Sequence, residues 1–383
     1  MDGYSASRKQ HHEEDIEMGC QEPLFLVGGK QELSVMAGKL TDFIASANTS
    51  LHIAIYDFRL KDEAIAAQVV GALKQSANKG IEVQIAYDHR NAPKFGPGDD
   101  PAPHGSDHFI TKQFTGTSVD FKPISWDPNV ASKSIAGQKL MHSKYVIRDG
   151  HTKNAAVLMG SANFTDDAWT HQDNNVLVFE SPQLCSYYET DFNELWASGD
   201  IYNTGVNDYG TVTQDGLNLD VAFSPGEGRR IDGEIVGMIL NAQDSIHIAS
   251  MVITSDTILN ALSQVLDAGR VKVRGILDGP EMKTSKAQMQ RSARSASKVQ
   301  QIDQLQKILV QKKSTPYKEN GVHDFMHNKL IVVDGTVLTG SHNFSLSAQH
   351  NAENAVLVRD EDLAEKYRGY VEGLIKKYGP AGT

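Results

Sequence analysis

Hydrophobic stretches of strand type alternate with stretches of helical type along the chain. Residues 51–55 (LHIAI) and 83–88 (VQIAYD) have the apolar pattern of strands, and residues 64–77 between them have helical spacing. The same succession returns in residues 246–278. Strand, helix and strand in this order predict a mainly parallel sheet covered by helices, which is an α/β layer architecture.

A polar motif is repeated on this framework. Residues 141–150 (MHSKYVIRDG) return as residues 326–335 (MHNKLIVVDG), so both copies have the form M-H-x-K-x-x-x-x-D-G. Residues 160–164 (GSANF) return as residues 340–344 (GSHNF). The copies lie about 180 residues apart, and an amphipathic helix pattern follows each of them. We infer that one folding unit is duplicated and that the two halves pack side by side.

The length of the chain agrees with two such units. Its 383 residues are two to three times the usual domain length of about 150 residues. We expect a disordered segment at residues 1–21, a first repeat at 22–200 and a second repeat at 230–378. Residues 201–229 are rich in Gly, Asn and Asp, and we expect them to form a linker.

The charge balance limits the partners that the chain can bind. The 37 Lys and Arg against 48 Asp and Glu give a formal net charge of -11, which disfavours binding of DNA over the whole surface. Residues 283–318 depart from this balance, because they hold nine Lys or Arg and one acid, a local charge of +8. This basic stretch is either a solvated face or a lid that faces phosphate, since it leads into the second copy of the motif.

The cellular compartment of the protein is suggested by three features that the sequence lacks: a disulfide framework, a signal peptide and a membrane span. The two cysteines, Cys20 and Cys185, are too few for a disulfide framework. Residues 1–22 have no apolar core of the kind that a signal peptide needs, and no stretch approaches the roughly 18 apolar residues of a membrane span. We expect a cytoplasmic protein, and secretion by a route without such a signal stays open.

The repeated motif carries groups that suit phosphodiester chemistry. In a strand, the His and Lys of each H-x-K point to the same face, whereas Asp149 and Asp334 point to the other and are assigned a structural role. One imidazole can attack phosphorus while the other protonates the departing oxygen, so neither a metal nor another cofactor is required. Lysine and asparagine groups can donate to the non-bridging oxygens. The candidate catalytic residues are His142, His327, Lys144, Lys329, Asn163, Asn343, Asp173 and Glu353.

Two further sets of residues complete the expected site. Asp173 and Glu353 would each accept the N–H of a histidine ring and fix its tautomer. Ser161, Ser341 and His342 lie within the G-S-x-N-F segments and are candidates for binding substrate, with a structural role as the alternative for His342.

The paired H-x-K-x4-D motifs with G-S-x-N-F resemble the phospholipase D superfamily over residues 22–378. The resemblance implies two pseudo-twofold-related α/β/α sandwich halves with mixed, mainly parallel sheets and one active site between them. It further implies a metal-independent reaction through a covalent phosphohistidine. Carried over by motif, His142 and His327 become nucleophile and general acid. We expect His142 to be the nucleophile, although the symmetry leaves the assignment reversible.

The sequence leaves the substrate open. A phospholipase D that converts glycerophospholipid to phosphatidic acid, with alcohol sometimes replacing water, fits the negative overall charge. A nuclease, or a cardiolipin hydrolase or synthase, fits the likeness of residues 326–345 to the short bacterial nuclease and cardiolipin-hydrolase branch, and residues 283–318 could then bind nucleic acid. A silent phosphate receptor is disfavoured because both sets of catalytic groups are present. We expect peripheral contact with a membrane surface, no obligate protein partner and a monomer.

Overall fold

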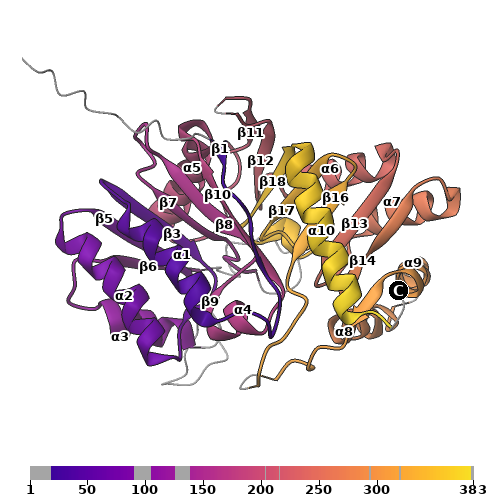
Figure 1. The fold of residues 1–383 in the computed structure, drawn as a ribbon, viewed down its shortest axis with the longest axis horizontal. Helices are drawn as coiled ribbons and strands as arrows, with labels where there is room; N and C mark the ends of the chain where they lie inside the picture. Colours follow the sequence, from indigo (N-terminus) through magenta and orange to yellow (C-terminus); the bar gives the residue numbers. More distant parts are fainter. Residues whose placement is uncertain are drawn as a thin grey trace, which may run out of the picture.

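The computed structural model describes residues 19–89, 105–125 and 139–380, apart from residues 203, 215, 293, 294, 319 and 320. Two mixed sheets, each with flanking helices, lie beside one another in this part of the chain (Figure 1). Most of the segment that we expected to be disordered lies outside the described residues, and its last residues form the short strand β1.

The first sheet has the order β1-β10-β8-β7-β3-β5-β6, with β2 also paired to β10. Its strands are β1 (Gly19–Cys20), β2 (Leu24–Leu26), β3 (Ser50–Ile55), β5 (Glu82–Asp88), β6 (Asp120–Ile124), β7 (Lys144–Arg148), β8 (Ala156–Gly160) and β10 (Asn174–Glu180). The small strands β4 (Phe58–Arg59) and β9 (Phe164–Thr165) pair with each other. The helices of this half are α1 (Leu33–Ala45), α2 (Glu63–Asn78), α3 (Ser106–Phe114), α4 (Asp166–Thr170) and α5 (Pro182–Ser198).

The second sheet has the order β11-β12-β18-β17-β16-β13-β14-β15. Its strands are β11 (Gly210–Val212), β12 (Leu219–Ser224), β13 (Ser245–Ser250), β14 (Lys272–Asp278), β15 (Val310–Lys312), β16 (Lys329–Val333), β17 (Thr336–Gly340) and β18 (Glu353–Arg359). Its helices are α6 (Gly228–Asn241), α7 (Asp256–Ala268), α8 (Gly279–Met289), α9 (Ala296–Ile308), the 3-10 helix η3 (Ala348–His350) and α10 (Glu361–Tyr378).

The two sheets share one strand order, which matches the duplication inferred from the sequence. The run β10-β8-β7-β3-β5-β6 corresponds to β18-β17-β16-β13-β14-β15. The expectation of a linker at residues 201–229 is wrong, because β11 and β12 lie there and β12 pairs with β18 along its whole length. β12 pairs with the main-chain groups that the edge of β18 would otherwise expose.

The α/β class is confirmed, but the sheets are not mainly parallel. In the described part of each sheet, β3-β5-β6 and β13-β14-β15 are the parallel runs, and the other neighbours are antiparallel. For β16 and β17 the reason is their short connection, since these strands are joined by the two residues Asp334 and Gly335. A connection of that length can only reverse the chain direction.

The hydrophobic core fixes the two halves against each other. Alternate residues of β7 face different clusters: Val146 packs in a cluster with α1 and α2, whereas Tyr145 packs in a cluster that reaches both sheets. This shared cluster contains Tyr188 of α5 and Tyr367 of α10. Burial of each such side chain contributes about 1.5–3 kcal/mol, so the interface holds β7 and β16 in a fixed relation. Among the described helices, none combines the length and the apolar character needed to cross a membrane.

Candidate active site

The residue before each motif histidine is held by an aspartate at the end of a strand, and the two strands are equivalent in the two repeats. The main-chain N–H of Met141 donates to Asp88 at the end of β5 (2.6 Å), and that of Met326 donates to Asp278 at the end of β14 (2.9 Å). Sequence reasoning missed this role of the two aspartates. Their positions after matching strand patterns were the signal that could have revealed it.

Main-chain hydrogen bonds between the repeats then hold each histidine at the seam. The N–H of His142 donates to the carbonyl of Ala352 (2.8 Å), and the N–H of His327 donates to the carbonyl of Asp173 (3.0 Å). Each histidine is therefore positioned by the repeat to which it does not belong.

Four of the expected residues line one cavity of about 570 Å³: His142, His327, Asn163 and Asn343. Lys144 and Lys329 lie behind this surface, 2% and 0% exposed, and each donates from Nζ to the carbonyl of its own histidine (2.6 Å in both). The structure thus brings together the His, Lys and Asn of both motifs.

Burial and mutual repulsion lower the pKa values of the basic groups. Burial lowers the pKa of Lys144 to about 7, against the attraction of Glu353. Burial lowers the pKa of Lys329 well below its ordinary value, and the charge on Lys144 adds to the effect. A bound phosphate anion would raise the pKa values of both lysines, because it supplies a counter-charge. The pocket is therefore suited to an anion.

The His142 ring is held by a carboxylate. Its Nδ1 lies 2.7 Å from Oε2 of Glu353, and Asn351 donates to the other carboxylate oxygen (3.1 Å). Burial lowers the pKa of His142 to about 4 even though Glu353 opposes that shift. The Tyr56 ring packs 4.7 Å from the imidazole, edge to face.

The His327 ring is held by an amide, which corrects the expectation for Asp173. Its Nδ1 lies 3.0 Å from Oδ1 of Asn174, and no hydrogen bond between the side chain of Asp173 and His327 is found in the described structure. Burial, followed by the charges of Lys329 and Lys144, lowers the pKa of His327 well below its ordinary value.

The strand register shows why the expectation failed. Gly160 pairs with Val176 in the first sheet, whereas Gly340 pairs with Ala355 in the second. Bridges outside the strands likewise match Asp173 with Ala352, because these residues pair with Met326 and Met141. The first copy has one extra residue around α4, so the structural counterpart of Glu353 is Asn174.

Asp173 has a structural position beside the site. Its carboxylate accepts from Lys312 Nζ (2.6 Å), from the N–H of Gly28 (2.9 Å) and from Tyr378 Oη (3.1 Å). Both members of the Asp173–Lys312 ion pair are buried. This pair ties β15 of the second repeat to the first repeat.

The three candidate substrate-binding residues are engaged elsewhere. Ser161 and Ser341 are fully buried and accept the main-chain N–H groups of Asn175 and Asn354 (3.1 and 3.0 Å). His342 is 1% exposed and pairs with Asp232 at 3.3 Å. None of the three lines the cavity, so a role in fixing the loops replaces the expected contact with substrate.

The motif aspartates face away from the cavity, as strand parity predicts. Asp149 accepts the main-chain N–H groups of residues 48–50 at 2.6–3.2 Å, and Asp334 accepts those of residues 243–245 at 2.8–3.0 Å. Both have positive φ, 54° and 47°, which is uncommon for a residue other than glycine. They fix the turn at the start of β3 and β13.

The basic stretch does not place its charges on the cavity. Lys312 is buried against Asp173, while Lys286 and Lys298 pair with Asp303 and Asp256. Arg294 lies outside the described residues. The stretch reaches the cavity through Thr284 and through Pro316 and Tyr317, and its described Lys and Arg are absent from the lining.

The lining of the cavity also contains residues that sequence reasoning missed. Three rings stack in the order Tyr317, His323 and Phe325, with centroids 5.1 and 5.4 Å apart. The lining also includes three acids and one arginine: Asp57, Asp167, Glu281 and Arg59. The three rings and Asp57 lie in loops, whereas Arg59 lies in β4, Asp167 in α4 and Glu281 in α8. No repeated pattern pointed to any of them.

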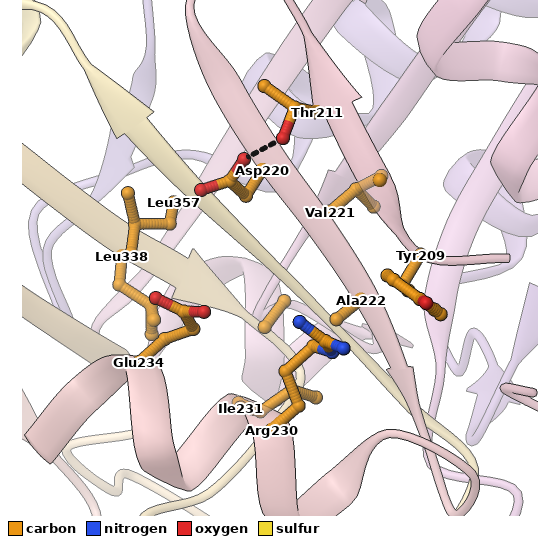
Figure 2. A pocket seen from close by; sticks show the side chains of 12 residues that line it. Tyr209, Thr211, Asp220, Val221, Ala222, Arg230, Ile231, Glu234, Leu338 and Leu357 are labelled. Atoms are coloured by element: carbon orange, nitrogen blue, oxygen red, sulfur yellow. Dashed lines mark hydrogen bonds between the residues drawn. The ribbon is translucent and has the colours of Figure 1, made fainter. Parts of the chain in front are cut away.

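A second cavity lies away from the motifs, on the outer part of the second sheet. Figure 2 shows its floor of aliphatic side chains on β12, β17 and β18, with Arg230 and Glu234 projecting from α6. Thr211 donates to Asp220 at its rim (2.6 Å). This cavity measures about 200 Å³ and contains none of the His, Lys and Asn residues of the motifs, so we assign the chemistry to the larger one.

Comparisons with known proteins identify the family of the chain. The family model described as "Cardiolipin synthase, PLD-like domain" matches residues 40–196 and 235–375, one match for each repeat. Phospholipase D of Rickettsia prowazekii (strain Madrid E) is 32% identical over 167 residues, 43% of this chain and 71% of that protein. Mitochondrial cardiolipin hydrolase of Xenopus laevis is 33% identical over 145 residues, 37% of this chain and 60% of that protein. The structure of phosphatidylserine synthase from Haemophilus influenzae Rd KW20 matches in fold, with TM-score 0.57, 14% identity, and coverage of 94% of this chain and 88% of that one.

Proposed function

Because the chain belongs to the phospholipase D superfamily and is a phosphodiesterase, we propose that it is a phospholipase D that releases the headgroup of a glycerophospholipid and leaves phosphatidic acid. In this proposal the phosphate lies between His142 and His327, and the amides of Asn163 and Asn343 face its non-bridging oxygens. The two ammonium groups behind the cavity surface offset its charge.

The reaction in this proposal needs two steps. One imidazole forms a bond to phosphorus while the other gives its proton to the oxygen of the headgroup alcohol. Water then hydrolyses the phosphohistidine and releases phosphatidic acid. Both functions are supplied by side chains, so we expect activity in the presence of a metal chelator.

The acids and rings of the cavity lining carry the choice of substrate. Asp167 and Glu281 would repel the neighbouring phosphates of a nucleic acid, whereas they would attract the ammonium group of a zwitterionic headgroup. Asp57 is buried and pairs with Arg59 (3.5 Å). The stacked ring faces of Tyr317 and Phe325 can add a cation–π contribution of about 0.5–2 kcal/mol. One cavity thus contains groups that can bind an anion and groups that can bind a cation.

The loop that carries the three stacked rings also supports contact with a lipid surface. Tyr317 and Val322 are 53% and 52% exposed, although most large apolar side chains of the described chain are buried. The exposed side chains of Lys313 and Lys318 lie in the same loop. Apolar and aromatic groups together with lysines are typical of segments that lie at a membrane interface.

A screen of substrates with EDTA tests the proposal. The purified chain is incubated with vesicles of phosphatidylcholine, phosphatidylethanolamine, phosphatidylglycerol or cardiolipin, with the His327→Ala chain as the control for contaminating activity. We expect phosphatidic acid and free headgroup from the zwitterionic lipids. Absence of both products from all four vesicles would remove phospholipid as the substrate class.

A nuclease is the second candidate, and α8 favours it. This helix lines the cavity with Thr284 and also carries the exposed Lys283, with the exposed Arg291 just beyond its end. Plasmid and single-stranded DNA therefore belong in the same screen. Digestion of DNA that weakens in Lys283→Glu and Arg291→Glu chains, most strongly at low salt, would support this candidate over the first.

A further inference from the structure

The two catalytic histidines differ in the group that holds Nδ1. The partner of His142 is the carboxylate of Glu353, which is 0% exposed. The partner of His327 is the neutral amide of Asn174, which occupies the equivalent strand position and is also fully buried. The repeats therefore supply a pseudo-symmetric pair of imidazoles, of which one has a charged partner at Nδ1 and the other a neutral partner.

The orientation of the Asn174 amide is fixed by its neighbours. Its Nδ2 donates to the carbonyl of Ala168 (3.1 Å), and its Oδ1 accepts from Ser161 Oγ (2.7 Å). The oxygen therefore faces His327, and Nδ1 of that ring must carry the hydrogen. In the neutral ring, the lone pair then lies on Nε2, which is the form that attacks phosphorus.

The two roles place opposite demands on the imidazoles before the reaction starts. The general acid must hold a proton in a buried pocket that also contains Lys144 and Lys329, and a carboxylate at its Nδ1 offsets the repulsion from their charges. The nucleophile must be neutral, and an amide acceptor is sufficient to fix its tautomer. Burial lowers the pKa of both rings, and the charges of Lys144 and Lys329 add to the fall in each. The carboxylate of Glu353 opposes the fall for His142, whereas for His327 the opposing contact is with the main chain of Ser161.

We propose that His327 is the nucleophile and His142 the general acid, with Asn174 as the positioning residue of the nucleophile. The assignment rests on the proposed phosphodiesterase reaction, and it reverses the order expected from the motifs. Nε2 of His327 forms the bond to phosphorus as the bond to the leaving oxygen breaks. The electron pair of that bond goes to the leaving oxygen, which takes the proton of His142.

The second step restores both rings. Neutral His142 removes a proton from water, and the water oxygen forms its bond to phosphorus as the bond from phosphorus to nitrogen breaks. The electron pair of that bond returns to Nε2 of His327. The products are a phosphomonoester and an alcohol, and His142 is protonated again.

A phosphodiester with a p-nitrophenyl leaving group separates the roles, because p-nitrophenolate departs without a proton. The probe carries neither lipid nor nucleotide, so the result does not depend on which natural substrate is correct. With the His142→Ala chain we expect a burst of p-nitrophenol equal to the enzyme concentration, no further turnover, and a phosphoryl adduct on His327 by mass spectrometry at alkaline pH. The His327→Ala chain should give neither burst nor adduct.

Two outcomes overturn the assignment. One is a burst in the His327→Ala chain with the adduct on His142. The other is the absence of a burst in a folded His142→Ala chain under conditions where the wild-type chain turns the probe over. Thermal unfolding of each variant, followed by circular dichroism, shows that the fold is retained.

Conservative variants of the two partners provide a second test. Asn174→Asp should raise the pKa of His327, so the loss of probe turnover on acidification should begin at higher pH than in the wild-type chain. Glu353→Gln should slow the release of an alkyl alcohol by at least about 100-fold but leave the p-nitrophenol burst within a few-fold. Two results would count against the assignment. One is an Asn174→Asp chain whose probe turnover falls at the same acidic pH as that of the wild-type chain. The other is a Glu353→Gln chain that releases the alkyl alcohol and p-nitrophenol with equal losses of rate.

Discussion

Nδ1 of His142 lies 2.7 Å from Oε2 of Glu353, a residue 211 positions further along the chain and in the other repeat. The main-chain N–H of His142 also donates to the residue before Glu353. One repeat therefore contains the imidazole and the other contains the groups that orient it. This exchange explains why the duplicated unit forms a single shared cavity.

The Glu353→Gln substitution tests whether that contact matters for the chemistry. The amide keeps the size and one acceptor of the carboxylate but loses its charge, so we expect kcat for an ester with a poor leaving group to fall by about 100-fold or more. Asp173→Asn is the matched control, because Asp173 was the sequence-based candidate and contacts Lys312 instead. Its kcat should stay within a few-fold once the protein is folded. Equal loss in both variants would contradict the site as described.

The pH dependence of kcat/KM follows from two groups of the substrate-free protein. The proton that His142 donates is bound with a pKa of about 4, and the charge of Lys144 is lost with a pKa of about 7. For a substrate with a poor leaving group, log kcat/KM should therefore fall with a slope of about -1 above the first pKa and more steeply above the second. With the p-nitrophenyl probe, whose leaving group needs no proton, the fall of log kcat/KM above the first pKa should disappear. A rise of kcat/KM through the first pKa with the lipid substrate would mean that His142 acts as a base or nucleophile.

The motif aspartates should act on stability and not on substrate. Burial raises the pKa of Asp149, but the N–H groups of Thr49, Asn48 and Ser50 outweigh this effect and the net pKa is lowered. Asp149→Ala should lower the free energy of unfolding by about 3 kcal/mol, because three main-chain donors lose a charged acceptor. Asp149→Asn should cost less, since asparagine keeps an acceptor and tolerates positive φ.

The same carboxylate gives a pH test with a definite sign. A lowered folded-state pKa means that the contribution of Asp149 is fully present above the unfolded pKa and is lost as the pH falls through the folded one. Urea unfolding of the wild-type and Asp149→Ala chains should converge in strong acid. A constant difference at all pH values would indicate that the loss comes from packing and not from the charge.

The acids and rings of the cavity lining should have a selective effect on headgroup choice. Glu281→Gln and Tyr317→Ala should raise KM for phosphatidylcholine several-fold and leave the kinetics of the p-nitrophenyl probe unchanged, because the probe lacks an ammonium group. Lys307→Ala is a suitable control for general surface charge, since this exposed residue does not line the cavity. A uniform loss on lipid and probe would show that these residues support the fold and not the headgroup.

The duplication, the α/β class and the groups at the seam were predictable because each depends on residues that recur in both halves. The His, Lys and Asn of both motifs lie together, as expected, and the structural neighbours confirm the fold class. The strand directions were not predictable from the apolar pattern alone. A strand with the same apolar residues can pair in either direction, and the short turn after Asp334 decides it here.

The error at Asp173 has a similar origin. Residues 176–178 and 356–358 are all apolar, so an alignment of the two halves that is wrong by one position loses no hydrophobic match. The true register is set by α4 in the first copy and the shorter η3 in the second. The sequence therefore placed an acid where the fold places the amide of Asn174.

Steady-state hydrolysis of a phosphodiester in EDTA by the wild-type, His142→Ala and His327→Ala chains is the most direct test of the shared two-histidine site. Each substitution removes one of two groups that act in the same catalytic cycle, so we expect turnover by the wild-type chain and a loss of about 1,000-fold or more in each variant, with unchanged thermal unfolding. Turnover near the wild-type rate in either folded variant would contradict the account.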